Sequence, residues 1–164
     1  MIIMTEKIKE TLLSIKKHYN IDLAIFNDRV KLQKIVYILK KMDLNALNKY
    51  NDFSWYLYGP YSSRLTKDAF EYFPEDSKNI IIDNLSSQIF TDFDKLITNF
   101  NLDKNKYPDY AVYELLASIV YFSNQKDLDK IYTKLVEKKP YLSDKELFNK
   151  AILILKEKNL INIE

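Results

Sequence analysis

The chain has 164 residues, of which 47% are hydrophobic, 14% aromatic and 29% charged, a composition typical of a folded chain rather than a disordered one. It contains no cysteine, one histidine (His18) and one glycine (Gly59), which excludes disulfides, thiolate zinc sites and the glycine-rich loops that bind nucleotides. The formal net charge of +2 indicates no partner by itself.

Charge is distributed unevenly along the chain. Residues 1–70 carry twelve Lys or Arg and seven Asp or Glu, a net charge of +5, whereas residues 71–164 carry thirteen and sixteen, a net charge of −3. A basic N-terminal half could face nucleic acid or an acidic protein. So modest an asymmetry is more often a solvated surface, and both interpretations stay open.

Neither a membrane-spanning helix nor a signal peptide is expected from the sequence. No apolar run approaches the ~18–20 residues of a membrane-spanning helix. The first ten residues, MIIMTEKIKE, lack the long apolar stretch and the small-residue cleavage site of a signal peptide. We expect a cytoplasmic protein with no membrane partner.

Helical periodicity dominates the first fifty residues. Thr5 is placed to cap a helix that ends near Tyr19, in which the single histidine is expected to be structural or exposed. Asn27 or Asp28 is expected to cap a second helix over residues 29–42, with lysines flanking its apolar face. The polar stretch that follows, DLNALNKYND, predicts a connection with a short helical turn.

The segment FSWYLYGPYSSRLTKDAFEYF, residues 53–73, is expected to organise the fold. Its apolar run, residues 53–58, predicts an extended segment that stops at Gly59-Pro60, because glycine reaches backbone angles closed to other residues and proline fixes φ. Ser62 or Ser63 then predicts the cap of a helix that begins near Arg64.

Strand alternation assigns faces to the aromatic run. Successive side chains of a strand point to opposite faces, so Phe53, Trp55 and Leu57 share one face, which can be the core face. Tyr56 and Tyr58 are then expected to point outward, next to Arg64.

Further helices are predicted downstream. Residues 79–84 are ambiguous between a strand and a helical turn. Amphipathic helices are predicted from Ser87 to about Asn101, from Pro108 onward, over a segment stopped by Lys139-Pro140, and after a capping box at Ser143–Glu146.

These patterns predict a mainly α fold of about six or seven helices with a small β element around residues 53–58, winged-helix-like in part. Residues 1–104 are expected to form the principal unit, and residues 105–164 a three-helix continuation packed on it as one globular domain.

Candidate catalytic groups are weak. Pairs of carboxylates occur at Asp92/Asp94, Glu75/Asp76 and Asp127/Asp129. None lies in an apolar stretch that would raise a pKa for acid–base chemistry, and helix caps or solvated faces explain them better. We expect no enzyme activity, no catalytic residue, no cofactor and no metal.

Two motifs carry a family resemblance. KLQKIVYIL (31–39), followed by WYLYGPYSSRL (55–65), resembles the YwgA-like family of small prokaryotic proteins. More distantly, the chain resembles the Panacea domain of SocA-like antitoxins, which pairs a KLQKLLY-type helix with a W-x-YGP-type turn. The matching positions are Lys31, Leu32, Gln33, Lys34, Tyr37, Tyr58, Gly59, Pro60, Tyr61, Ser62 and Leu65. The resemblance implies a non-enzymatic helical protein that acts by contact, in the Panacea branch with a toxin.

The sequence therefore predicts a protein-interaction module, antitoxin-like or regulatory. Its expected partner-binding residues are Lys31, Gln33, Lys34, Tyr37, Tyr58, Tyr61 and Arg64, and its expected structural turn is Gly59, Pro60 and Ser62. The alternative is a winged-helix-like DNA-binding regulator that uses lysines of the first two helices. Scarcity of arginine, the usual bidentate reader of guanine, disfavours that alternative. A homodimer is left open.

Overall fold

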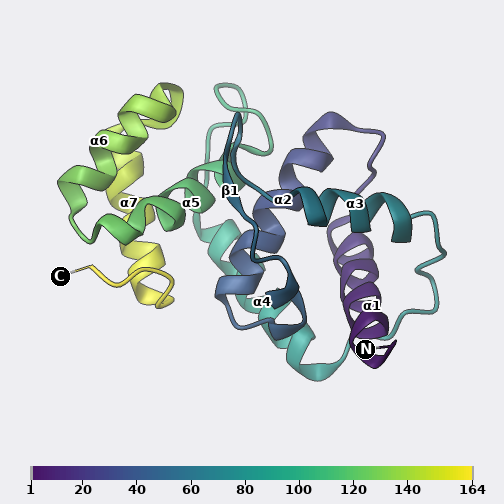
Figure 1. The fold of residues 1–164 in the computed structure, drawn as a ribbon. Coiled ribbons are helices and arrows are strands. Elements are labelled where there is room, and N and C mark those ends of the chain that lie inside the picture. Colours follow the sequence, from purple (N-terminus) through teal and green to yellow (C-terminus); the bar gives the residue numbers. More distant parts are fainter. Residues whose placement is uncertain (1, 164) are drawn as a thin grey trace. The chain divides into compact units, whose positions relative to one another are not determined.

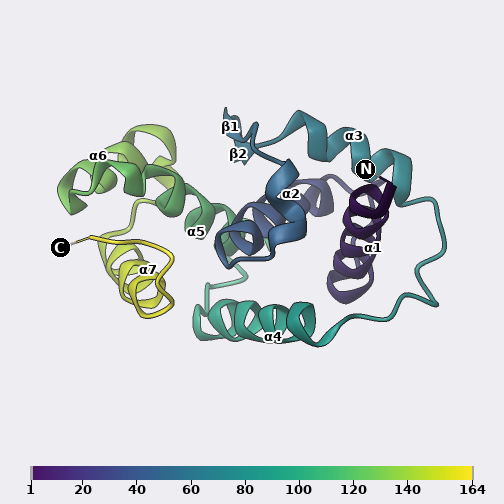
Figure 2. The ribbon, with the colours of Figure 1, turned by 60° about the horizontal axis from the view of Figure 1, so that its bottom comes forward.

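The computed structural model describes residues 2–163. In these residues it contains seven α-helices, three short 3-10 helices and one two-stranded antiparallel sheet (Figures 1 and 2). The predicted class, mainly α with a small β element, is confirmed. The elements are α1 (Ile2–Tyr19), α2 (Phe26–Lys41), η1 (Asn45–Lys49), β1 (Ser54–Tyr56), β2 (Gly59–Tyr61), α3 (Ser63–Tyr72), α4 (Asn84–Asn99), α5 (Ala111–Phe122), η2 (Ser123–Gln125), α6 (Leu128–Lys138), η3 (Pro140–Leu142) and α7 (Lys145–Glu157).

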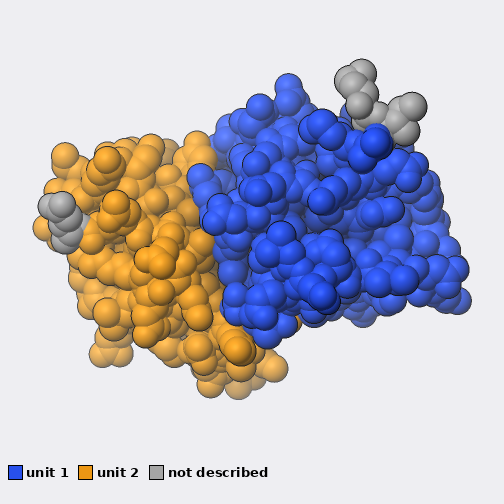
Figure 3. Space-filling view, turned by 90° about the horizontal axis from the view of Figure 1, so that it is seen from below, with its two compact units in different colours: residues 1–93 blue, residues 94–164 orange. Residues whose placement is uncertain are grey.

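The chain divides into two compact units, residues 1–93 and residues 94–164, coloured separately in Figure 3. The division falls inside α4. The predicted boundary after residue 104 lies in the loop that follows this helix, because the amphipathic pattern of α4 gives no reason to divide it.

The first unit is built around α2. Helix α2 packs against β2 and η1, and α1 packs against α3 and η1, as both ribbon views show (Figures 1 and 2). Every residue of α2 from Leu32 to Leu39 is buried, including Gln33 and Lys34. A helix surrounded on several sides normally carries apolar residues all round. Gln33 and Lys34 therefore need partners, and these are found in the hairpin described below.

Lysine side chains of α1 form hydrogen bonds and an ion pair with the segment that follows α3. Lys16 Nζ donates to the carbonyl of Phe73 at 2.5 Å, and Lys9 pairs with the Glu75 carboxylate at 2.6 Å. Lys17 Nζ lies 3.4 Å from the carbonyls of Lys78 and Ile80. Part of the basic charge of the N-terminal half therefore makes contacts within the unit.

The second unit encloses an ion pair. Glu114, in the apolar helix α5, is fully buried, and its Oε1 lies 3.0 Å from Nζ of the buried Lys139. Its Oε2 accepts a 2.5 Å hydrogen bond from the hydroxyl of Tyr141 in η3. Helix α5 packs against α6 and α7, so the carboxylate lies at the centre of this unit.

Three local predictions about helix ends are corrected. The N-cap of α2 is Ile25 rather than Asn27 or Asp28, because the Asp28 carboxylate accepts the N–H of Asp22 and fixes the preceding loop. α7 is capped by Asp144, not by a capping box from Ser143, whose hydroxyl donates to the Pro140 carbonyl. Helix α1 begins at Ile2, before the expected cap Thr5.

Three further predictions have clear outcomes. Residues 79–83 are neither strand nor helix, and α4 begins at Asn84. Ser62 caps α3 as expected, because its hydroxyl accepts the N–H of Leu65 at 3.1 Å. The helical turn expected between residues 43 and 52 is η1.

Candidate functional site

The candidate site is a β-hairpin mounted on α2. Strands β1 and β2 pair in the register Ser54–Tyr61, Trp55–Pro60 and Tyr56–Gly59, and residues 57 and 58 form the tip. Gly59 has φ of 102°, well beyond the left-handed helical region that other residues tolerate. The single glycine of the chain is therefore required by this turn.

Gln33 joins α2 to the base of the hairpin. Its Oε1 accepts the backbone N–H of Ser62 at 2.8 Å, and its Nε2 donates to the Ser62 carbonyl at 3.1 Å and to Thr66 Oγ1 at 2.8 Å. Ser62 is fully buried, and its carbonyl also accepts the N–H of Thr66 at 3.2 Å, so it is the Ser62 N–H that depends on Gln33. One glutamine thus fixes the point where β2 becomes α3.

Lys34 fixes the hairpin one residue further along α2. It is 2% exposed, and its Nζ donates to the carbonyl of Pro60 at 3.0 Å. Pro60 has no backbone N–H with which to form a sheet hydrogen bond. Its carbonyl oxygen accepts a hydrogen bond from the ammonium group of Lys34. A buried charge in this position holds the hairpin against the helix.

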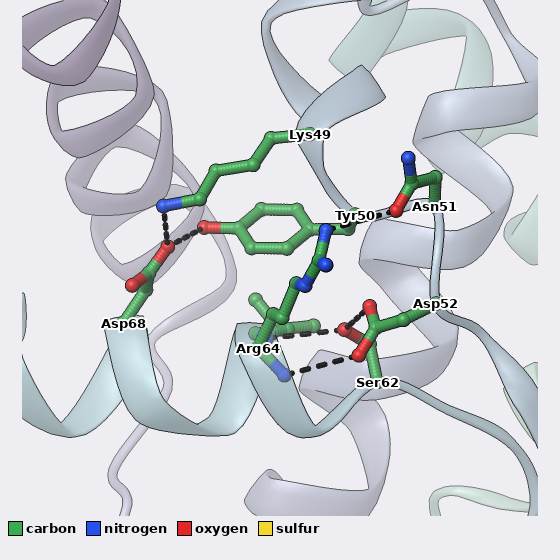
Figure 4. Close-up of polar contacts among 8 residues, drawn as sticks. Lys49, Tyr50, Asn51, Asp52, Ser62, Arg64 and Asp68 are labelled. Carbon is green, nitrogen blue, oxygen red and sulfur yellow. Dashed lines mark hydrogen bonds and ion pairs between the residues drawn. The ribbon is translucent and has the colours of Figure 1, made fainter.

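Asp52 and Ser62 form the first cluster at the foot of the hairpin (Figure 4). The Ser62 hydroxyl donates to Asp52 Oδ1 at 2.6 Å, and the N–H of Arg64 donates to Oδ2 at 3.3 Å. Partial burial pushes the pKa of Asp52 upward, but the hydrogen bonds from Ser62, Arg64 and Ser63 outweigh burial and lower that pKa below its ordinary value. The charged carboxylate therefore supports the N-terminus of α3.

Tyr50, Lys49 and Asp68 form a second cluster beside the first (Figure 4). The hydroxyl of the fully buried Tyr50 donates to Asp68 Oδ2 at 2.7 Å, and Lys49 Nζ lies 2.8 Å from the same oxygen. Burial, together with the neighbouring Asp68 carboxylate, raises the pKa of Tyr50 far above its ordinary value. Tyr50 therefore stays neutral and donates a hydrogen bond to Asp68, which joins the end of η1 to α3.

A pocket of about 250 Å³ opens between α2 and the hairpin, inside the first unit. Phe26 and Tyr58 meet edge to face, with ring centroids 5.2 Å apart, and Tyr56 lies 5.2 Å from Tyr61. The pocket is lined by Phe26, Arg29, Val30, Gln33, Lys34, Tyr56, Leu57, Tyr58, Gly59, Tyr61 and Thr66.

Four of the predicted partner-binding residues, Gln33, Lys34, Tyr58 and Tyr61, meet around this pocket. The other three, Lys31, Tyr37 and Arg64, do not line it. Lys31 pairs with Asp28 at 3.4 Å, the buried Tyr37 ring packs 5.1 Å from Phe53, and the Arg64 guanidinium donates to Asn51 Oδ1 at 3.0 Å. The predicted turn residues Gly59, Pro60 and Ser62 are all buried in the hairpin.

Strand alternation fails at the tip. Leu57, assigned to the face that can be the core face, is 72% exposed, because it belongs to the turn and not to a strand. Tyr56 is 56% exposed, as expected. Two large apolar side chains therefore project from a backbone that buried hydrogen bonds hold in place.

Several residues of the site were not singled out from the sequence. Asp52 and Asp68 are separated by sixteen positions and Tyr50 lies among polar residues, so no local spacing marks them as partners. Phe26 and Arg29 lie in the first turn of α2, and nothing in the sequence pattern there distinguishes them from other residues at the start of a helix. A polar Asn-Asp pair directly before the apolar run was the one available signal for Asp52.

Comparisons with family models, with curated proteins and with solved structures give no match for this chain. In the described part of the chain, no three His, Asp or Glu side chains gather closely enough to hold a metal ion. None of the helices between residues 2 and 163 combines the length and apolarity needed to cross a bilayer.

Proposed function

We propose that the chain is a non-enzymatic protein-interaction module, antitoxin-like or regulatory, that acts in the cytoplasm by binding a protein partner with the hairpin tip and its pocket. The single observation that carries the proposal is the exposure of Tyr56 and Leu57 on a fixed turn. Exposed apolar groups on a preorganised backbone bind with little loss of conformational entropy.

The predicted site residues take two roles in this proposal. Gln33, Lys34 and Tyr37 are buried and position the hairpin, whereas Tyr58 and Tyr61 are half-buried and line the pocket. Lys31 and Arg64, which do not line the pocket, are proposed as further partner contacts outside it. The resemblance of the KLQK and YGP motifs to YwgA-like and Panacea proteins supports the antitoxin-like form, in which the partner is a toxin.

Affinity capture from the native host tests the proposal. The Tyr56→Ala/Leu57→Ala variant removes the exposed side chains, and Leu153→Ala, which truncates a 68% exposed leucine of α7, is the matched control. A contact at the centre of an interface contributes about 2 kcal/mol or more. We expect one protein to be recovered in stoichiometric amounts by the wild type and the control and to be lost from the hairpin variant.

The antitoxin-like form makes a stricter demand on the captured protein. Expressed alone, that protein should stop growth of the host, and co-expression of the wild-type chain, but not of the hairpin variant, should restore growth. Equal capture by all three chains would remove the hairpin as the contact surface. A captured protein that is harmless on its own would leave the regulatory form and exclude the antitoxin.

A further inference from the structure

The pocket beside the hairpin has the dimensions of a side-chain receptor. Its volume of about 250 Å³ lies below the ~300–1,000 Å³ of pockets that enclose whole small molecules or cofactors. Its walls include the rings of Phe26, Tyr56, Tyr58 and Tyr61. A pocket of this size and lining fits one large apolar side chain of a bound segment.

Most polar groups of the pocket are already engaged within the unit. Gln33 is committed to Ser62 and Thr66, and Lys34 Nζ donates to the Pro60 carbonyl. Thr66 Oγ1 lies 2.9 Å from the hydroxyl of Tyr61. These groups shape the pocket and contribute little to orienting a ligand.

Arg29 is different. Its Nη1 donates to the Leu23 carbonyl at 2.7 Å, and its guanidinium carbon lies 5.7 Å from the centre of the Phe26 ring. Among the described residues, no carboxylate pairs with it, and no acidic side chain lines the pocket. The neighbouring Asp28 is buried and is directed to Lys31 and to the N–H of Asp22.

We infer that the pocket receives a peptide segment of the partner in which a large apolar side chain stands next to a carboxylate, the apolar side chain filling the pocket and the carboxylate pairing with Arg29. This inference rests on the proposed function and specifies its partner. Charge complementarity selects this occupant, because a guanidinium with unused donors at the rim of an apolar pocket matches a carboxylate in a two-bond fork.

Gly59 gives the experiment a natural reporter. It lines the pocket and is the only glycine of the chain, so its amide resonance can be followed by ¹H–¹⁵N NMR without ambiguity. The probes are three short peptides that differ only at their centre: Asp-Phe-Asp, Asn-Phe-Asn and Asp-Ala-Asp. We expect the Asp-Phe-Asp peptide to shift the Gly59 signal saturably and the other two to bind at least about tenfold more weakly, since a hydrogen bond to a charged group and a buried ring each contribute that much.

Protein variants separate charge from shape. Arg29→Gln should remove the preference for Asp-Phe-Asp over Asn-Phe-Asn, Arg29→Lys should keep part of it, and Lys130→Gln, at an exposed position of α6, should leave it unchanged. Equal binding of the acidic and amide peptides to the wild type, retention of the preference by Arg29→Gln, or no shift of Gly59 with any peptide would overturn the inference. A second copy of the chain as the occupant would appear as a concentration-dependent dimer in sedimentation, and this too would overturn it.

Failure of the inference can be told apart from failure of the proposed function. If the Tyr56→Ala/Leu57→Ala variant loses the native partner while Arg29→Gln still captures it fully, the hairpin is the contact surface and the acidic anchor is wrong. If neither variant affects capture, the proposed function itself is wrong.

Discussion

Gln33 is the side chain on which the position of the hairpin most directly depends. A hydrogen bond between protein groups adds only about 1 kcal/mol net, but a buried donor left without a partner costs about 1–3 kcal/mol. Gln33 accepts the N–H of the fully buried Ser62, a donor with no other partner among the described residues, whereas the Ser62 carbonyl also accepts the N–H of Thr66. Its contribution therefore comes mainly from what its loss would leave unsatisfied.

The Gln33→Ala variant should accordingly lower the free energy of unfolding by about 1–3 kcal/mol, measured by urea denaturation. Gln88→Ala is the matched control, because Gln88 is exposed on α4 and bonds only to Asp92, one turn away. We expect the control to change stability by less than about 0.5 kcal/mol. Equal losses in the two variants would contradict the role of Gln33.

The carboxylate of Asp52 should make the stability of the fold depend on pH. The folded state lowers the pKa of Asp52, so its stabilisation is fully present above the unfolded pKa and is lost as pH falls through the folded pKa. The stability advantage of wild type over Asp52→Asn should therefore shrink as the pH is lowered below the ordinary carboxyl value of 3.8. Urea denaturation of both chains across this range measures this difference, with Asp129→Asn, at an exposed position, as control. An advantage that stays constant with pH would refute the assignment.

Among the elements, helix α5 depends on a buried ion pair for its stability, because the charge of its buried Glu114 is compensated by Lys139. Removing one partner of a buried ion pair leaves an uncompensated charge, which costs about 3–5 kcal/mol, whereas replacing both by apolar groups is often neutral or stabilising. This asymmetry gives a sharp test.

Lys139→Met alone should lower the unfolding free energy by about 3–5 kcal/mol, and Glu114→Leu/Lys139→Met should recover most of that loss. Urea denaturation of the single and double variants measures both values, and Lys138→Met, at an exposed position one residue earlier, is the control. A double variant less stable than the single one would show that the pair is not the source of the cost.

Elements differ in how well the sequence predicted them. α6 ends before Lys139-Pro140 as predicted, and Ser62 caps α3, because proline and a capping hydroxyl act within one turn. Asp28 was expected to cap α2 but bonds to Asp22, since a carboxylate can satisfy more than one neighbouring N–H and periodicity does not choose between them.

The site was predicted only in part for a similar reason. Helical and strand patterns placed Gln33, Lys34, Tyr58 and Tyr61 on two elements, and the structure brings these four around one pocket. The burial of Lys34 could not be read from the pattern, because its side chain is charged and the Pro60 carbonyl that it contacts is 26 residues away in sequence.

For the whole molecule, the amount and placement of positive charge bear on whether the partner is a protein or DNA. The net charge is only +2, α2 is buried along most of its length, and Lys9, Lys16 and Lys17 of α1 make contacts within their own unit. These features limit what the lysines of the first two helices can offer to phosphate groups. They favour the protein-interaction module over a DNA-binding regulator.

Titration with duplex DNA at several salt concentrations measures this preference. We expect no binding tighter than the ~10⁻⁴–10⁻⁶ M of non-specific association at physiological salt. Tight binding with a steep dependence of log K on log salt would instead support the regulator.

Photo-crosslinking in the native host tests the central claim, that the hairpin tip touches a protein partner, most directly. A benzoylphenylalanine in place of Leu57 is compared with one in place of Leu153, which is similarly exposed on α7. If the hairpin tip contacts a protein partner, one discrete covalent adduct should form from position 57 and be missing from position 153. No adduct from position 57, or the same adducts from both positions, would contradict it.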